Sequence, residues 1–198
     1  MKKKEITSDL LIKAAIELFT EHGVENTSLA MIAKKAGITK PSIYYHFDSK
    51  DALLERVFEE CAEMYPFEDF IKISKLNEEN FAQMLFDGGI KAFPKEEDHA
   101  RVKLHMELSS IAQRNEKYRK YSLANEKKFI DGLEKTLEKG VEFGLISPEN
   151  TKIKAKMLMI SLDGIGIYRL MHTTVSEQES VAVWKEIVNS ILLKGKLQ

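Results

Sequence analysis

The stretch from residue 27 to residue 47, TSLAMIAKKAGITKPSIYYHF, constrains the fold more than any other part of the chain. Apolar residues at spacings of three and four predict a short helix that ends at Gly37, because glycine enters the left-handed conformation without steric cost. Pro41 then falls in the first turn of a second short helix, where its missing N–H does no harm. Two small helices joined by a tight turn that contains glycine predict a helix-turn-helix.

Hydroxyl side chains stand where both helices should begin. Thr27 or Ser28 can cap the first helix and Thr39 the second, since a hydroxyl accepts hydrogen bonds from free backbone N–H groups. If Ile43 and Phe47 face the first helix, the second helix directs its polar and aromatic side chains outward. These are Lys40, Ser42, Tyr44, Tyr45 and His46.

The charge of this stretch is one-sided. No acidic residue lies between Glu25 and Asp48, whereas Lys34, Lys35 and Lys40 do. Phosphates repel carboxylates and attract ammonium groups, so this face suits a DNA backbone. The plainer interpretation is a surface that merely carries lysines, but the caps, turn, proline and aromatics all favour DNA binding. With a formal net charge of −1 for the chain, nucleic-acid affinity must come from this local patch.

Residues 30–54, AMIAKKAGITKPSIYYHFDSKDALL, resemble the N-terminal signature of TetR-type transcriptional repressors. Ile-Ala, Ala-Gly-Ile, Tyr-x-His-Phe and Lys-Asp-x-Leu-Leu occur in register. The resemblance implies that Lys40 and Ser42 meet base edges and that Pro41 contacts a thymine methyl group. It also implies a DNA-contacting set completed, mainly at phosphates, by Thr27, Ser28, Thr39, Tyr44, Tyr45, His46 and Lys50. Ala30 stands where many members have Arg or another polar residue, and we therefore expect this chain to lack one contact to the DNA backbone.

We expect an all-α chain of about nine helices in two domains. Residues 1–50 would form a three-helix DNA-binding domain, and residues 51–198 a helical effector-binding and dimerisation domain. A helix should begin at Ser8 after a mobile basic arm, and another should run from residue 50 to 64 and connect the domains. Beyond it, helical periodicity without any period-two alternation predicts helices at 77–93, 97–112, 116–143, 151–172 and 177–193.

The second domain is rich in methionine and phenylalanine, which adapt to irregular space. An apolar or amphipathic small molecule could lie between its helices. The alternative is that these are ordinary core residues, and the pocket hypothesis depends on the family resemblance. The expected lining is Phe81, Leu85, His105, Met106, Phe129, Met157 and Tyr168.

The last two predicted helices suggest an interface. One carries an apolar stripe, and the helix before it is apolar nearly all round and contains small residues that allow close approach. The resemblance implies a two-fold dimer through a four-helix bundle. The expected interface residues are Ser161, Gly164, Trp184, Ile187, Val188 and Ile191.

No spacing of residues points to catalysis. The five histidines lack the spacing of metal ligands, Cys61 has no cysteine companion, and there is no glycine-rich phosphate loop. We therefore expect no enzyme, no metal and no cofactor. A lone cysteine and the lack of a run that could span a bilayer favour a cytoplasmic protein.

These features predict a ligand-responsive transcriptional regulator. It would be a repressor that binds an inverted-repeat DNA operator as a homodimer and is released by a small-molecule effector. An activator would show the same features. The alternative is a small-molecule or protein-interaction module that has the same fold and does not bind DNA.

Overall fold

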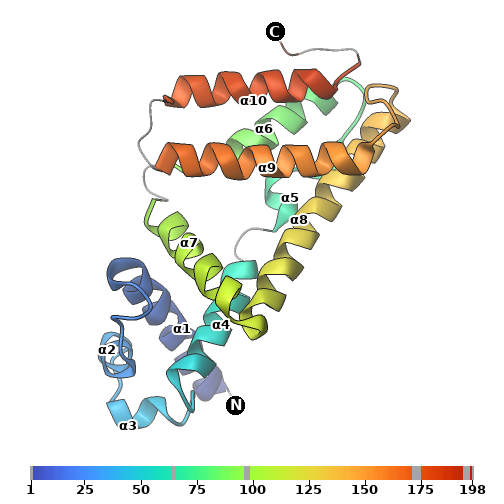
Figure 1. Cartoon of the computed structure of the whole chain (residues 1–198). Helices are drawn as coiled ribbons and strands as arrows, with labels where there is room; N and C mark the ends of the chain where they lie inside the picture. Colours follow the sequence, from blue (N-terminus) through green and yellow to red (C-terminus); the bar gives the residue numbers. More distant parts are fainter. Residues whose placement is uncertain (1, 64–65, 96–98, 171–174, 194–196, 198) are drawn as a thin grey trace. The chain divides into compact units, whose positions relative to one another are not determined.

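The computed structural model describes residues 2–63, 66–95, 99–170, 175–193 and 197, and within them every regular element is helical (Figure 1). The predicted all-α class is confirmed. The only strand-like pairing in the described ranges is an isolated bridge between Ile146 and Leu192. The elements are α1 (Lys2–His22), α2 (Leu29–Lys35), α3 (Lys40–Ile43), α4 (Lys50–Glu63), α5 (Phe67–Phe70), the 3₁₀ turn η1 (Ile73–Lys75), α6 (Phe81–Ala92), α7 (His99–Arg114), α8 (Glu116–Glu142), α9 (Thr151–Leu170) and α10 (Glu177–Ile191).

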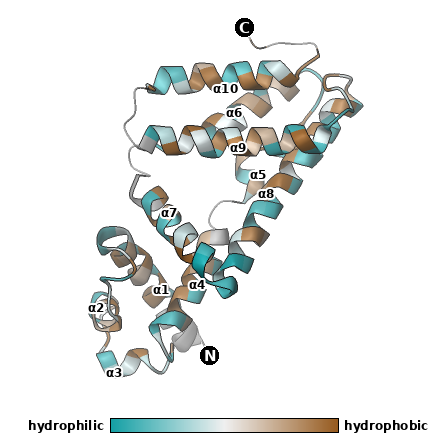
Figure 2. Ribbon diagram, in the orientation of Figure 1, coloured by the Kyte–Doolittle hydropathy of each residue, from teal (hydrophilic) through white to brown (hydrophobic). Residues whose placement is uncertain are grey.

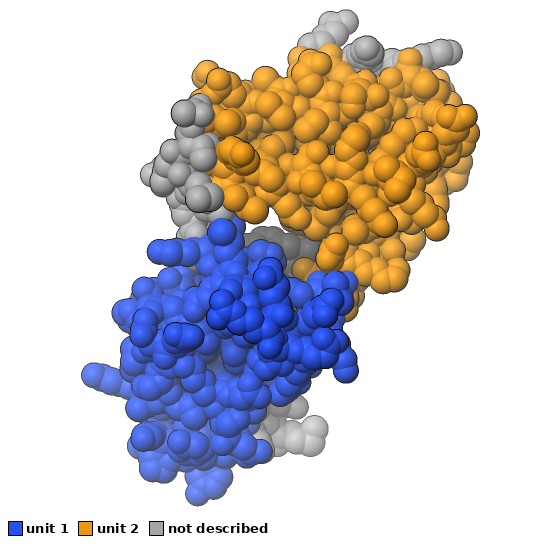
Figure 3. Space-filling view, viewed as in Figure 1, with its two compact units in different colours: residues 1–64, 98–123 blue, residues 65–97, 124–198 orange. Residues whose placement is uncertain are grey.

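The chain divides into two compact units, coloured separately in Figure 3. The first unit comprises residues 1–64 and 98–123, and the second comprises residues 65–97 and 124–198. The first unit thus includes α4 and α7 and is larger than the DNA-binding domain predicted at residues 1–50. A functional division into residues 1–50 and 51–198 stays a prediction.

The first helix is longer than its sequence pattern indicated. We expected a mobile basic arm before a helix start at Ser8, but α1 already begins at Lys2. The run of lysines therefore continues the helix instead of preceding it, consistent with the good helix propensity of lysine. Gly23, with φ +82°, follows its last residue and turns the chain toward α2.

The core of the first unit lies where α1, α2, α3, α4 and α7 pack together. Its fully buried apolar side chains include Leu11, Phe19, Ile32, Ile43 and Leu53. Each lies at a helical spacing of three or four from another residue of this core that is buried or partly buried, as the periodicity of the sequence predicted. This core holds α2 and α3 on a rigid base.

The core of the second unit contains large rings that lie directly on glycine backbone. A Cβ added to Gly89 would lie 2.2 Å from the Trp184 indole, and one added to Gly132 would lie 2.4 Å from the Phe67 ring. Trp184 Nε1 also donates to the carbonyl of Phe86 at 3.0 Å. Glycines therefore bring α6 and α8 close to their neighbours in this unit.

The predicted dimer interface on α10 does not hold for Trp184, Val188 and Ile191. These side chains are 1%, 0% and 5% exposed and belong to the core of their own unit. Ile187 is half-buried and also packs against that core. The apolar stripe of α10 therefore packs within its own unit, where the Trp184 indole lies directly against Gly89 of α6.

Candidate nucleic-acid interface

The helix-turn-helix is built by the local signals that the sequence predicted. Ser28 caps α2, and its hydroxyl accepts from the Met31 N–H at 3.3 Å. Gly37, with φ +74°, forms the turn, and Pro41 lies in the first turn of α3. Thr39 occupies the cap position of α3, but its hydroxyl pairs with that of Ser42 at 2.7 Å and not with a backbone N–H.

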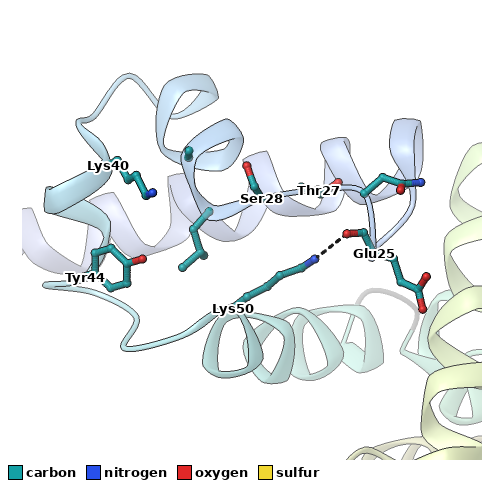
Figure 4. A pocket seen from close by; sticks show the side chains of 9 residues that line it. Glu25, Thr27, Ser28, Lys40, Tyr44 and Lys50 are labelled. Atoms are coloured by element: carbon teal, nitrogen blue, oxygen red, sulfur yellow. Dashed lines mark hydrogen bonds between the residues drawn. The ribbon is translucent and has the colours of Figure 1, made fainter.

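Several predicted DNA-contacting side chains lie exposed around α3. Tyr45 is 77% exposed and Tyr44 is 48% exposed, and Lys40, Pro41 and Thr39 also face solvent. Beside them is an open depression of about 430 Å³ (Figure 4). It is lined by Glu25, Asn26, Thr27, Ser28, Leu29, Ala30, Lys40, Tyr44 and Lys50.

The sequence interpretation missed part of this depression. Glu25 and Asn26 precede the first residue of the predicted site, yet both line the depression. Figure 4 shows Glu25 across the depression from Lys40. Leu29 and Ala30 also line it. The predicted cap at Ser28 could have indicated these residues, because residues on both sides of a helix cap lie together at that end of the helix.

Lys50 binds backbone within its own unit. Its Nζ donates to the carbonyl of Val24. It also donates, at 3.3 Å, to the carbonyl of Glu25, and Figure 4 shows this second bond. An ammonium has three donors. Lys50 can therefore hold the α1–α2 turn and still present a positive charge at the depression.

His46 and Ser42 are less exposed than the expectation that they face outward implies, and Thr27, a predicted phosphate contact, is buried. Thr27 is 1% exposed, and its hydroxyl donates to the carbonyls of Gly23 at 2.8 Å and Leu18 at 3.2 Å. Its predicted phosphate contact through the side chain is therefore wrong. His46 and Ser42 are half-buried, and His46 Nδ1 lies 3.1 Å from the Ser8 hydroxyl.

The three lysines of the acid-free stretch are not equivalent. Lys35 pairs with Glu17 at 2.9 Å and with Glu21 at 3.5 Å, and its hydrogen bond to Glu17 is the main cause of its raised pKa. Lys34 and Lys40 are exposed and have no such ion pair within the described part of the chain. The positive charge available to a phosphate is thus concentrated at Lys34, Lys40 and Lys50.

The seven residues of the predicted effector lining are divided between the two units. His105 and Met106 are exposed on α7, in the first unit, whereas the other five belong to the second. Of those, Met157 and Tyr168 are 38% and 55% exposed on α9, and Phe81 and Leu85 are fully buried in the core. Phe129 is half-buried and contacts the rings of Phe67 and Phe70.

A small apolar void lies in the second unit next to two of the predicted residues, Leu85 and Phe129. Its volume is about 10 Å³. The void is lined by Phe67, Phe70, Ile71, Leu85, Gly88, Gly89, Phe129, Leu133, Leu162 and Trp184. Sites for drug-sized ligands measure roughly 300–1,000 Å³, so these side chains fill the space that such a ligand would need.

An apolar row faces outward on α9, where brown segments recur in Figure 2. Ile153, Met157, Ile160 and Ile167 are 61%, 38%, 70% and 41% exposed. Gly164 completes the alternating spacing of four and three, and a Cβ added to it would meet nothing within 4 Å. Ser161 flanks the row and is half-buried. A repeat of 3.5 residues is the spacing of helices that pair side by side.

Two other features are absent from the described residues. These residues contain no group of three or more His, Cys, Asp or Glu residues arranged to hold a metal ion. Among them no helix combines the length and the apolar character needed to cross a bilayer.

Comparison with known proteins agrees with this architecture. Residues 11–57 match the family model described as "Bacterial regulatory proteins, tetR family". A TetR transcription regulator from Haloarcula marismortui has the same fold, with a TM-score of 0.80 at 18% identity over 95% of this chain and 99% of that one.

Two curated relatives extend the comparison. The biofilm operon icaADBC HTH-type negative transcriptional regulator IcaR of Staphylococcus epidermidis is 33% identical over 110 residues, which are 53% of this chain and 55% of that protein. The A-factor receptor protein of Streptomyces griseus is 25% identical over 197 residues, which are 93% of this chain and 63% of that protein. The chain thus spans about 55–63% of the length of these relatives. Residues 11–57 therefore match the TetR family of regulatory proteins, and the chain as a whole is similar to TetR-type regulators in fold.

Proposed function

We propose that the protein is a homodimeric repressor that binds an inverted-repeat DNA operator and leaves it when a small molecule binds. The observation that carries this proposal is the exposed set of Lys40, Tyr44 and Tyr45 around α3, next to the depression at the start of α2. The name of IcaR, a negative transcriptional regulator, supports repression. The name of the A-factor receptor supports control by a ligand.

In this proposal α3 enters the major groove. Lys40 reads a guanine edge and Pro41 contacts a thymine methyl group, and a good contact of this kind discriminates by about 1–3 kcal/mol. Thr39, Tyr44, Tyr45 and Lys50 contact phosphates, which set the register of the complex. Ser28, Ser42 and His46 lie at the edge of this surface and complete the set from the sequence, without Thr27.

The second copy of the chain pairs through α9 in this proposal. The outward row at 153, 157, 160, 164 and 167 would be covered by the same row of a partner, as an isologous contact requires. Two recognition helices could then meet successive major grooves, roughly 34–36 Å apart. Pairing through α9 replaces the α10 residues predicted from sequence.

The dimer is tested by Ile160→Asp. Ile160 is 70% exposed, so the aspartate is harmless to a monomer but would be buried in the proposed interface. Analytical ultracentrifugation should find a monomer. Leu10→Asp, at a 50% exposed leucine of α1, is the matched control and should stay dimeric. Dimers in both variants would remove α9 from the interface.

The effector is an apolar molecule that enters the core of the second unit near Phe67, Phe70 and Phe129. The lining of the small void there is apolar, and a ligand would have to displace rings to fit. Displacement would favour a state that differs from the DNA-bound one. Effector and DNA would then weaken each other's binding by the same factor.

The decisive experiment selects duplexes bound by the full-length protein from random DNA. We expect an approximate inverted repeat, and compounds that release it can then be screened. Lys40→Ala should lose preference for the selected sequence, whereas Tyr45→Phe should weaken binding to every duplex. If no sequence is enriched and mobility of duplex DNA is unchanged at low salt, the chain is instead a binding module without DNA contact.

A further inference from the structure

Val24, in the turn between α1 and α2, has both of its backbone polar groups bound by side chains of other helices. Its N–H donates to Glu107 Oε1 at 2.7 Å, and its carbonyl accepts from Lys50 Nζ. Glu107 lies on α7, 83 residues along the chain, and Lys50 is the first residue of α4. Val24 is only 5% exposed, so water is a poor substitute for either partner.

The Glu107 carboxylate lies beside the C-terminal end of α1. The last carbonyls of a helix carry a partial negative charge, which repels an anion. Yet its Oε1 would lie 3.3 Å from a Cβ added to Gly23, the residue directly after α1. The bond from the Val24 N–H holds the carboxylate at this helix end, and Lys50 donates to the carbonyls of Val24 and Glu25 in the same turn.

The turn held in this way leads directly into the candidate nucleic-acid interface. Residues 25–28 follow Val24 and line the depression, and Ser28 begins α2. The Thr27 hydroxyl fixes the same segment from its other end through the carbonyl of Gly23 at 2.8 Å. A shift of the Val24 backbone would therefore move the start of α2 and, through the turn at Gly37, α3.

We infer that Glu107 is a positioning residue for DNA binding. It touches no DNA and acts through the Val24 N–H, which sets the path of the turn before α2. This inference rests on the proposed function. It gives α7 a role in DNA binding that the exposed side chains around α3 do not reveal by themselves.

The test compares Glu107→Leu with Glu107→Gln in the full-length protein, on a duplex selected by the wild type. Leucine keeps much of the volume and removes the acceptor, whereas the glutamine amide oxygen can still accept from Val24. We expect operator binding about tenfold weaker for leucine and within about threefold of wild type for glutamine. Gln113→Leu, at an exposed site of the same helix, is the matched control and should bind as wild type does.

Two further measurements separate positioning from other roles. The slope of log affinity against log salt should be unchanged in Glu107→Leu, since no phosphate contact is lost. Hydrogen exchange of the Val24 amide should be faster in the leucine variant only. If circular dichroism finds Glu107→Leu unfolded, Glu107→Ala, which also lacks the acceptor, takes its place.

Equal operator binding by wild type and Glu107→Leu would overturn this inference and leave the proposed function intact. An affinity loss as large in Glu107→Gln as in Glu107→Leu would also overturn it, because the acceptor would then not be the cause. A wild-type protein that binds no selected duplex would overturn the proposed function, and the inference with it.

Discussion

The two units of the chain are stabilised by different kinds of contact. In the first unit, side chains far apart in sequence make hydrogen bonds, such as Glu107 to the Val24 N–H and Tyr118 to Asp51. In the second unit, rings and branched side chains lie on glycines, as Trp184 does on Gly89. Hydrogen bonds respond to charge and pH, whereas close packing responds to volume. The comparison predicts that substitutions of each kind affect one unit more than the other.

The largest effect should come from Trp184→Ala. Trp184 is 1% exposed, packs on Gly89 and Phe93, and donates a hydrogen bond to the Phe86 carbonyl. Its truncation leaves a cavity and removes this hydrogen bond, so the free energy of unfolding should fall by about 3–5 kcal/mol. Urea denaturation measures this loss. Tyr45→Ala, at an aromatic residue that is 77% exposed, is the control and should change stability by less than about 0.5 kcal/mol.

A second prediction uses one substitution at two glycines. Gly132→Ala should destabilise by about 1–3 kcal/mol, because its methyl group would overlap the Phe67 ring, 2.4 Å from the nearest ring atom. Gly164→Ala, also within a helix but in open space, should stabilise by about 0.5–1 kcal/mol.

Both glycine variants should be compared in the Ile160→Asp background, so that pairing of two chains does not contribute. Equal effects at the two glycines would mean that close packing does not distinguish them. The proposed basis of the second unit's stability would then be wrong.

Structure that depends on neighbouring residues could be predicted from the sequence, whereas packing between distant residues could not. The caps, the turn glycine and Pro41 act within a few residues, so the helix-turn-helix could be predicted. The stripe of α10 indicated a helix with one apolar face, but not whether that face turns inward. The apolar face of α10 turns inward because Trp184 packs on Gly89, which is far from it in the sequence. Likewise, nothing near His105 or Met106 indicates that α7 belongs to the first unit.

The hydrogen bonds of the first unit are tested by Tyr118→Phe. The Tyr118 hydroxyl donates to the Asp51 carboxylate and lies 3.2 Å from the Asp51 carbonyl, while its ring stacks on Phe58 at 4.6 Å. Phenylalanine keeps the stacking and loses only the hydroxyl. We expect a loss of about 1–2 kcal/mol at neutral pH.

The pH dependence of this loss has a definite sign. The hydrogen bond from Tyr118, followed by Lys117, holds the pKa of Asp51 below its ordinary value. A carboxyl with a lowered folded-state pKa contributes stability above its unfolded-state pKa and loses it as the pH falls through the folded value. The difference between wild type and Tyr118→Phe should therefore shrink in acid. A difference that is constant from neutral pH to acid would mean that the ionised form of Asp51 is not the partner that matters.

The smallest effect should come from Lys117→Met, beside the same carboxylates. Lys117 Nζ lies 2.9 Å from Glu55 and 3.1 Å from Asp51, and the pKa of Lys117 is raised mainly by its hydrogen bond to Glu55. All three side chains are exposed enough for water and salt to screen their attraction. The loss of stability should therefore be smaller than that of Tyr118→Phe and should disappear in 1 M salt, where the Debye length is about 3 Å. A loss in Lys117→Met that equals the tyrosine effect and persists in 1 M salt would mean that salt does not screen the Lys117 contacts, and would give the Tyr118 hydroxyl a secondary part in the contact between α4 and α8.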